Sequence, residues 1–291
     1  TSGTEFVLLG LTRDPLLQSL LFTVFLIIYL IILLGNMVIM MVIRTNLHLH
    51  SLMYFFLFYL ALVDICYATA VVPKMLVNFL VKGSITIAVN ACMTQMFFIF
   101  LSAGCEVFML SVMAYDRYVA MCNPLKYQEA MNKHFCYQLV GSAWAMCLNT
   151  IPVLNIQFCG HTEIKHFSCE LPPLLSAACS GTFLSKLILL FSAVLFGSSS
   201  FLLTLISYIY IIATVLKIQS AEGRHKAFST CSSYFIVVGL LYITALFQYT
   251  NPKSVSSIIL DQVRSTQYSI LTPMLNPIIY SLKNKDVKTA L

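Results

Sequence analysis

Seven long apolar stretches divide the chain, with polar connections between them. A helix needs about 20 mostly apolar residues to cross the roughly 30 Å hydrocarbon layer of a membrane, because each residue advances it by about 1.5 Å. Backbone N–H and C=O groups must be paired within lipid, so continuous segments of this length are expected to be helices. A membrane β-barrel would show segments of about ten residues with strict alternation. The pattern predicts an all-α membrane protein with spans at about 19–43, 52–80, 89–121, 135–157, 185–217, 227–249 and 257–281.

Composition agrees with lipid as the solvent. Hydrophobic residues make up 59% of the chain and charged residues 10%, whereas a soluble domain carries about 25% charged residues. The net charge of +6 does not indicate a nucleic-acid partner, because Lys and Arg lie singly between apolar runs and form no basic face. We read residues 1–291 as a single seven-transmembrane domain that resides in the plasma membrane, with membrane lipid as a partner.

The orientation follows from the basic residues in the connections. Cytoplasmic loops are enriched in Lys and Arg, and ten of the 17 such residues fall on the side that carries the end of the chain. We therefore expect the N-terminus outside. The charged run from Lys283 to Lys288 that follows the seventh span is expected to form a short amphipathic helix on the inner leaflet.

One connection, about 155–184, is long and holds Cys159, Cys169 and Cys179, while Cys92 begins the third span. On the oxidising side of a membrane these four thiols suit two disulfides, and four cysteines allow three pairings. The alternative is a set of buried thiols. That interpretation fits the six cysteines in or beside the helices better.

Two carboxylates lie inside spans, Asp64 in the second and Glu106 in the third. A charge at the bilayer centre costs about 2.5–3.5 kcal/mol on insertion scales, so such groups usually face the bundle interior. Facing acids repel each other unless one is protonated or a cation sits between them. One hypothesis is that they bind a sodium ion, or share a proton, together with Asn36 and Asn276; in the alternative they are neutral and only hydrogen-bonded.

The inner end of the third span carries Asp116 and Arg117. Such a pair at a membrane boundary is often only solvated, with a stabilisation of about 0–1 kcal/mol. The seventh span contains Pro277 next to Asn276. Proline removes a helix hydrogen bond and bends the helix, so this segment is a candidate switch.

Several segments together resemble the odorant receptor family of rhodopsin-like G-protein-coupled receptors. They are Leu33-Leu34-Gly35-Asn36, Met53-Tyr54-Phe55-Phe56-Leu57, the span around Asp64, Met113 to Ala120, Lys226 to Cys231, and Pro273-Met274-Leu275-Asn276-Pro277-Ile278-Ile279-Tyr280. They span nearly the whole chain in order and at compatible spacing. One Asp-Arg-Tyr alone is weak evidence.

The resemblance implies roles for particular residues. It implies the disulfides Cys92–Cys169 and Cys159–Cys179. It implies that Arg117 holds the inactive state through Asp116 and meets the G protein when the sixth helix moves. The other positions implied in activation and coupling are Tyr118, Tyr208, Lys226, Asn276, Pro277 and Tyr280, and those implied in a sodium or polar network are Asp64, Glu106 and Asn276.

The resemblance also implies an odorant pocket in the outer half of the bundle, between helices 3, 5, 6 and 7. An aminergic receptor would need a carboxylate near Ile99, because a desolvated ammonium requires a counter-charge, and the sequence has none there. We therefore expect a small, neutral, hydrophobic volatile ligand, a stimulatory olfactory-type G protein that raises cAMP, and location in sensory cilia. The expected ligand-binding residues are Ile99, Phe100, Ala103 and Gly104 in the third span, Ser192, Ala193 and Phe196 in the fifth, Tyr242, Ala245, Leu246 and Tyr249 in the sixth, and Thr266 and Ser269 in the seventh.

Three other functions are weighed against this one. A transporter often shows inverted repeats, and none is visible. An intramembrane hydrolase is disfavoured because the histidines lie mostly in loops without His-Glu-x-x-His spacing, so we expect no enzyme and no cofactor beyond the possible sodium ion. A receptor for a peptide or a lipid is the third alternative.

Overall fold

The fold comes from a computed structural model, in which some positions are described by their backbone alone. The described residues are 5–12, 14–46, 52–81, 83, 85–127, 131, 134, 137–138, 141, 158, 163–164, 166–171, 173–174, 178, 182–217, 219–225, 239, 262–263, 265–283 and 287. The expected fourth and sixth spans lie almost entirely outside them. So does the expected amphipathic helix, apart from Lys283, which ends the last described helix, and the buried helical Val287.

Long apolar helices dominate the described part of the chain. These are α1 (Pro15–Thr45), α2 (Leu52–Leu80), α3 (Val89–Cys122) and α7 (Thr182–Leu216), followed by the shorter α10 (Thr272–Lys283). Among the described residues, α1, α2, α3 and the Gly197–Leu216 part of α7 are long and apolar enough to cross a membrane. The helix α1 begins where the sequence favours it, since the Asp14 side chain accepts from the backbone N–H of Leu16 and Pro15 occupies the first turn.

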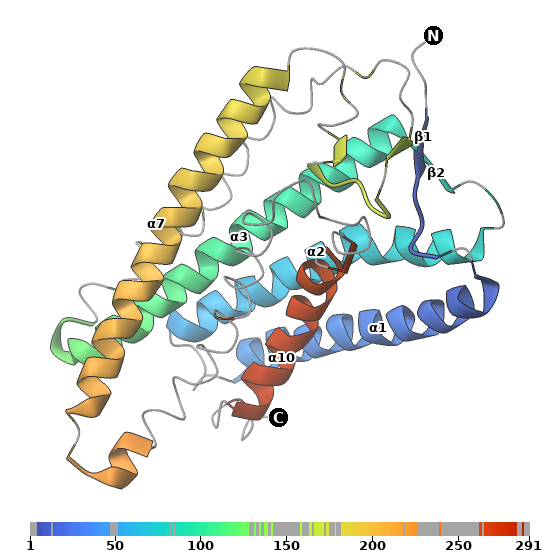
Figure 1. The fold of residues 1–291 in the computed structure, drawn as a ribbon. Helices are drawn as coiled ribbons and strands as arrows, with labels where there is room; N and C mark the ends of the chain where they lie inside the picture. The colour runs from blue at the N-terminus through green and yellow to red at the C-terminus, as the bar shows by residue number, and fades with distance from the viewer. Residues whose placement is uncertain are drawn as a thin grey trace.

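The helices pack in a defined order. The helix α2 lies between α1 and α3, α3 also packs against α7, and α10 packs mainly against α1 (Figure 1). The most hydrophobic windows of α2 and α3 are more than half buried, whereas that of α1 is about one-fifth buried. The exposed apolar face of α1 is what a lipid-facing helix requires, because lipid tails are as apolar as these side chains.

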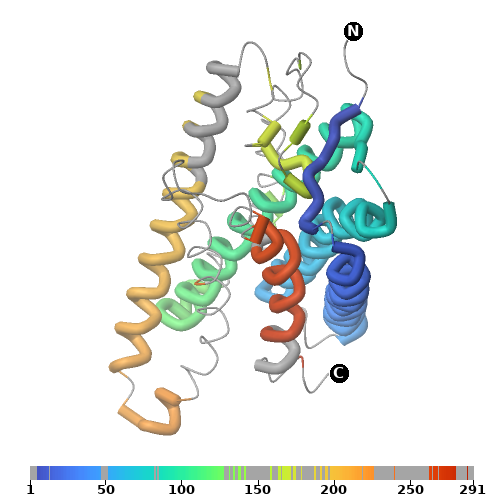
Figure 2. Tube along the Cα trace, turned by 45° about the vertical axis from the view of Figure 1, so that its right-hand side comes forward, coloured from blue at the N-terminus to red at the C-terminus, as the bar shows by residue number. Residues whose placement is uncertain are grey.

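A small sheet, which the hydrophobic pattern did not predict, lies at one end of the bundle. The strand β1 (Glu5–Leu8) is central and pairs antiparallel with β2 (Ile85–Ala88) and parallel with β3 (Glu163–Ile164). Figure 2 shows β1 running along this end, away from the C-terminal end of α10. The sequence predicts that this end faces outward, and it is called the outer end below.

Two apolar clusters fill the described bundle. The outer apolar cluster includes Tyr67, Val71, Ile99, Phe167 and Ile270. The inner apolar cluster joins α1, α2, α3 and α7 at the opposite end and includes Leu57, Leu60, Met109, Met113 and Tyr208. The polar residues of the sequence-predicted site lie between these two clusters along α2, α3 and α10.

The seventh span is irregular. A π-helical turn, η4 (Gln267–Leu271), precedes α10, and the N–H of Thr272 donates to the carbonyl of Gln267. Pro273 follows at once and has no N–H to continue the α-helical pattern. Such π turns concentrate at functional sites, and this one lies directly above the Asn276–Pro277 segment.

Candidate functional site

The Cys92–Cys169 disulfide joins the start of α3 to the long loop, with a Cα–Cα distance of 5.4 Å. This pairing confirms the expectation from the family resemblance. Cys66, Cys105 and Cys122 carry no disulfide, as expected for thiols in the helices. Cys159 and Cys179 lie outside the described residues, and their pairing stays a prediction. An isolated antiparallel bridge between Phe158 and Ala178 does connect the positions immediately before them.

Gln95 fixes the bridged loop from below, although the sequence analysis did not select it. Its Nε2 donates to the carbonyl of Ala70 at 2.9 Å, and its Oε1 accepts from the N–H of Cys169 at 3.0 Å. One buried amide therefore links α2, α3 and the loop. Its position three residues after Cys92 on α3 is the signal that sequence reasoning could have used.

Glu170 ties the same loop to the seventh span and was also missed. Its Oε1 accepts a hydrogen bond from the hydroxyl of Ser168 and another from the hydroxyl of Ser265. His166 stacks on Phe167 and shares a hydrogen bond with Ser168. The loop thus reaches the helical residues just above η4, and the adjacency of Glu170 to a bridging cysteine was the available hint.

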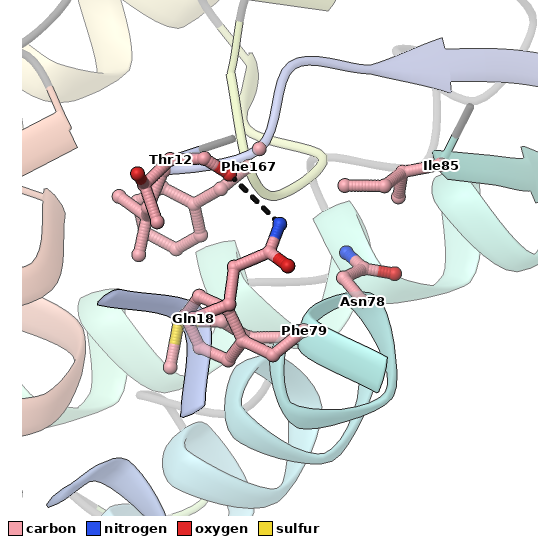
Figure 3. A pocket seen from close by; sticks show the side chains of 9 residues that line it. Thr12, Gln18, Asn78, Phe79, Ile85 and Phe167 are labelled. Carbon is pink, nitrogen blue, oxygen red and sulfur yellow. Dashed lines mark hydrogen bonds between the residues drawn. The ribbon is translucent and has the colours of Figure 1, made fainter. Parts of the chain in front are cut away.

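The N-terminal segment closes over α2 beside this loop. The N–H of Leu9 donates to the carbonyls of Ile164 and His166, and Gln18 donates to the carbonyl of Thr12 at 3.1 Å (Figure 3). The cavity there has a volume of about 10 Å³. A space of that size admits at most one water molecule, so it is not an odorant site.

Asn78 lines this small cavity and is 5% exposed. Neither polar atom of its side chain has a hydrogen-bond partner among the described residues. An unpaired buried amide is costly, and a single water molecule would satisfy it.

The structure brings together three of the four residues expected to hold a cation. Asp64, Glu106, Asn36 and Asn276 are all buried. The amide of Asn276 donates to Asp64 Oδ2 at 2.9 Å and also lies against Glu106. Asn36 donates to the carbonyls of Ile32 and Pro273, at 3.0 and 3.3 Å. Asp64 of α2, Glu106 of α3 and Asn276 of α10 therefore form one polar core, and Asn36 of α1 bonds to α10 three residues before Asn276.

This polar core has unused acceptors. Asp64 Oδ1, both carboxylate oxygens of Glu106 and Asn276 Oδ1 accept no hydrogen bond from any described residue. Buried carboxylate oxygens need protons, donors or a cation. An all-oxygen set is also what a small hard cation prefers, so the residues fit the sodium hypothesis, and a shared proton remains the other way to compensate the charge.

At the inner end Asp116 is bonded by a residue that the sequence analysis did not select. The hydroxyl of Tyr127 donates to Asp116 Oδ1 at 2.7 Å. Tyr127 directly follows the 3-10 turn η2 (Pro124–Lys126), so it connects the loop after α3 to the buried carboxylate. Arg117 is half-buried beside it. The bond couples the position of this loop to the Asp116–Arg117 pair.

The remaining activation residues are partly described. Tyr208 is buried in the inner apolar cluster, and the ring of Tyr118 lies 5.5 Å from that of Tyr210. Pro277 approaches Gly35, where a Cβ would lie 3.1 Å from the proline Cβ. Lys226 and the side chain of Tyr280 lie outside the described residues.

The four expected ligand-binding residues of the third span lie on α3. Ile99 and Ala103 belong to the outer apolar cluster, Phe100 is half-buried and Gly104 is exposed. Neither the small cavity beside the N-terminal segment nor the open groove between α2 and α3 is lined by them. The side chains of Ser192, Ala193 and Phe196, and residues Tyr242, Ala245, Leu246 and Tyr249, lie outside the described part.

Thr266 and Ser269 lie on the seventh span, but each hydroxyl already donates its proton to a backbone carbonyl of the same helix. Thr266 donates to the carbonyl of Gln262 at 2.8 Å, and Ser269 donates to the carbonyl of Ser265 at 2.6 Å. A hydroxyl has one proton and two lone pairs. In this conformation both side chains can still accept a hydrogen bond from a ligand.

Comparison with known proteins identifies the family. A model of the family described as "Olfactory receptor" matches residues 25–291. Olfactory receptor-like protein OLF4 of Canis lupus familiaris is 44% identical over 99% of this chain and 94% of its own length. Olfactory receptor 5P60 of Mus musculus is 47% identical over 100% of this chain and 92% of its own. Olfactory receptor 5M1 of Homo sapiens is 45% identical over 100% of this chain and 94% of its own length. The chain therefore belongs to the olfactory receptor family, whose fold class is the seven-transmembrane helix bundle.

Proposed function

We propose that this receptor binds a small, neutral, hydrophobic volatile molecule in the outer half of its bundle. The observation that carries the proposal is the outer apolar cluster, in which Ile99 of α3, Phe167 of the loop and Ile270 of η4 pack together. Small-molecule sites are mostly apolar with a few polar groups. Burial of apolar ligand surface supplies most of the favourable free energy.

The hydroxyls of the seventh span favour one kind of polar group on the ligand. Thr266 and Ser269 donate their protons within their own helix, so each offers only lone pairs. A ligand hydroxyl that donates a hydrogen bond matches them better than a ligand carbonyl. Among neutral odorants of one chain length, an alcohol is therefore expected to be more potent than the matching ketone.

Signalling would follow from a population shift between two conformers. A ligand moves that equilibrium by no more than the difference in its affinity for them. An odorant of about ten heavy atoms has limited binding free energy, so potency in the roughly micromolar range is expected. We propose that the active conformer engages a stimulatory olfactory-type G protein through Arg117 and its neighbours and raises cAMP. Its expected location is the plasma membrane of sensory cilia, in keeping with the olfactory receptors to which it is similar.

A cAMP reporter assay in cells tests the proposal. The panel contains matched alcohols, ketones, esters and amines, and the uncoupled control is Arg117→Ala at equal surface expression. We expect neutral members to raise cAMP in the wild type and no response from Arg117→Ala. Activation by amines at low concentration without activation by neutral odorants would refute the ligand class. An undiminished response from Arg117→Ala would refute the coupling route.

We also propose that the polar core binds a sodium ion. Asp64, Glu106 and Asn276 would hold it through their oxygens, with Asn36 beside them. Its single positive charge would offset one of the two buried negative charges and lower the repulsion between the carboxylates. The unsatisfied oxygens of Asp64 and Glu106 support this proposal.

Sodium titration separates this proposal from a shared proton. Odorant potency and the thermal stability of the purified receptor are measured against sodium concentration, with N-methylglucamine replacing sodium at constant ionic strength. We expect both to change in the wild type and to be flat in Glu106→Gln. An equally flat wild-type response in both measurements would eliminate the cation.

A further inference from the structure

A second and larger cavity lies outside the outer apolar cluster. It is an open groove of about 450 Å³ between the outer parts of α2 and α3, with β2 across its top. The groove presents mainly apolar side chains. Those that matter below are Ala70 and Lys74 of α2, Thr86 of β2, and Ala91, Thr94 and Phe98 of α3.

Lys74 is the only charged side chain among the described residues that line the groove. Its Nζ donates to the carbonyl of Thr86 at 2.8 Å, which fixes the ammonium group against the edge of β2. An ammonium group has three protons to donate. Two therefore remain available for a partner in the groove.

The depth of Lys74 matches that of a lipid headgroup. It lies six residues before Leu80, the last residue of α2, which is about 9 Å along the axis of a regular helix. A lysine near a helix end commonly reaches the membrane interface. At the outer end, the interface is where phosphate groups of lipids lie.

The α3 wall of the groove faces outward from the bundle. Ala91, Thr94 and Phe98 are exposed, and Phe98 is 43% exposed although it is a large apolar residue. Their spacing of three and four residues places them on one face of the helix. In a membrane this face lies against acyl chains.

We propose that this groove is a specific site for a phospholipid, whose phosphate pairs with Lys74 and whose acyl chain follows the Ala91–Thr94–Phe98 face. The charge selects the occupant, because the ammonium group of Lys74 has two protons left to donate and a lipid phosphate is an anionic acceptor. A neutral sterol or diacylglycerol would cover the apolar wall but leave the ammonium group without an anionic partner. The site is separate from the proposed odorant region, since its α3 wall is the exposed one and Ile99 is buried on another face.

A lipid bound in the groove would also contact a residue that holds the bridged loop. Gln95 lines the groove and is the residue that accepts from the N–H of Cys169. A lipid in the groove therefore adjoins the amide that links α2, α3 and the loop. This contact gives lipid composition a direct route to the outer end of the receptor.

Photocrosslinking in nanodiscs tests the site. The purified full chain is placed in phosphatidylcholine nanodiscs with a trace of phosphatidylcholine that carries a diazirine on its acyl chain, and the labelled peptides are mapped by mass spectrometry. We expect labelling within α3 around Phe98. Because an exposed ion pair contributes up to about 1 kcal/mol, Lys74→Gln should reduce this labelling by roughly fivefold. Lys74→Arg should retain it.

Two controls keep the result interpretable. Lys217→Gln removes the same charge from an exposed lysine at the far end of α7 and should leave the labelling unchanged. Ala91→Trp fills the groove and should abolish labelling while Lys74 remains. If Lys74→Gln does not fold, comparison of α3 labelling between the wild type and Ala91→Trp still tests whether the lipid occupies the groove. Equal labelling of α3 by a diacylglycerol probe with the same chains would overturn recognition of the phosphate, and undiminished labelling of Ala91→Trp would overturn the site.

Discussion

At the residue scale, Gly35 shows how a single missing side chain permits helix packing. A Cβ added there would lie 3.1 and 3.2 Å from the Cβ and Cγ of Pro277, which is closer than ordinary van der Waals contact. The same construction at Gly197 of α7 meets nothing within 4 Å. The sequence motif that contains Gly35 therefore has a packing reason, which is the approach of α1 to the bend of α10.

This difference predicts opposite effects of one substitution. Gly197→Ala should raise the thermal stability of the purified receptor slightly, because alanine is favoured over glycine by about 1 kcal/mol in a helix. Gly35→Ala should lower it, since overpacking costs about 1–3 kcal/mol. Melting curves in detergent measure both. Equal shifts for the two variants would show that the Gly35–Pro277 approach does not limit the side chain.

Tyr127 illustrates a residue whose role depends on one hydrogen bond. Its hydroxyl donates to the buried Asp116, and a hydrogen bond to a charged group contributes about 1.5–3 kcal/mol. Tyr127→Phe should lower thermal stability accordingly. In a double-mutant cycle with Asp116→Asn, we expect a coupling free energy above about 1 kcal/mol. The control is Tyr115→Phe, and a Tyr127→Phe effect no larger than this control would contradict the assignment.

At the element scale, the sequence predicted the long helices better than the short elements. Expected boundaries of 52–80 and 89–121 compare with Leu52–Leu80 and Val89–Cys122, because a membrane-crossing helix must be long and apolar throughout. The strands β1 and β2 have four residues each. Their pairing depends on segments far apart in sequence, which periodicity within one segment does not reveal. The π turn before Pro273 was missed for a different reason, because it depends on local backbone geometry that the hydrophobic pattern does not show.

The Glu170–Ser265 hydrogen bond makes a prediction about the seventh span. It attaches the loop to the residues just before η4, so Ser265→Ala and Glu170→Gln should both loosen that segment. Hydrogen exchange of peptides covering 265–283 should become faster in either variant, and the double variant should add little because the two residues act as one unit. Ser198→Ala, which removes an exposed hydroxyl of α7, should leave it unchanged. Unaltered exchange in both single variants would exclude this anchor.

At the scale of the whole molecule, the buried acidic residues of the site could be predicted from the sequence, whereas the polar residues that attach loops to helices could not. Buried acids are costly in lipid, so Asp64 and Glu106 could be selected from the sequence alone, and the structure places both at Asn276. Gln95, Glu170 and Tyr127 could not be selected in this way. Each is a polar residue whose importance comes from a partner in another element, and a single sequence does not show such partners.

The Cys92–Cys169 bridge connects these features into one outer assembly. It closes a loop of 77 residues, and disulfides of this kind stabilise by about 2–4 kcal/mol. Cys92→Ser, Cys169→Ser and the double variant should lower the melting temperature equally, because either change breaks the same bond. Cys66→Ser, which alters a half-buried thiol outside the bridge, should have little effect.

Removal of the disulfide should also destabilise the strand β1, although neither bridging cysteine belongs to that strand. The strand β3 precedes Cys169 in the same loop and pairs with β1, and Leu9 bonds to two carbonyls of that loop. Without the bridge the loop keeps its pairing with β1 and its hydrogen bonds to Leu9, Gln95 and Ser265, but it loses its covalent attachment to α3, so the partner of the N-terminal strand is less constrained. Amide exchange in residues 5–12 should therefore accelerate in the double variant. If this segment stays as protected as in the wild type, β2 alone is sufficient to hold β1.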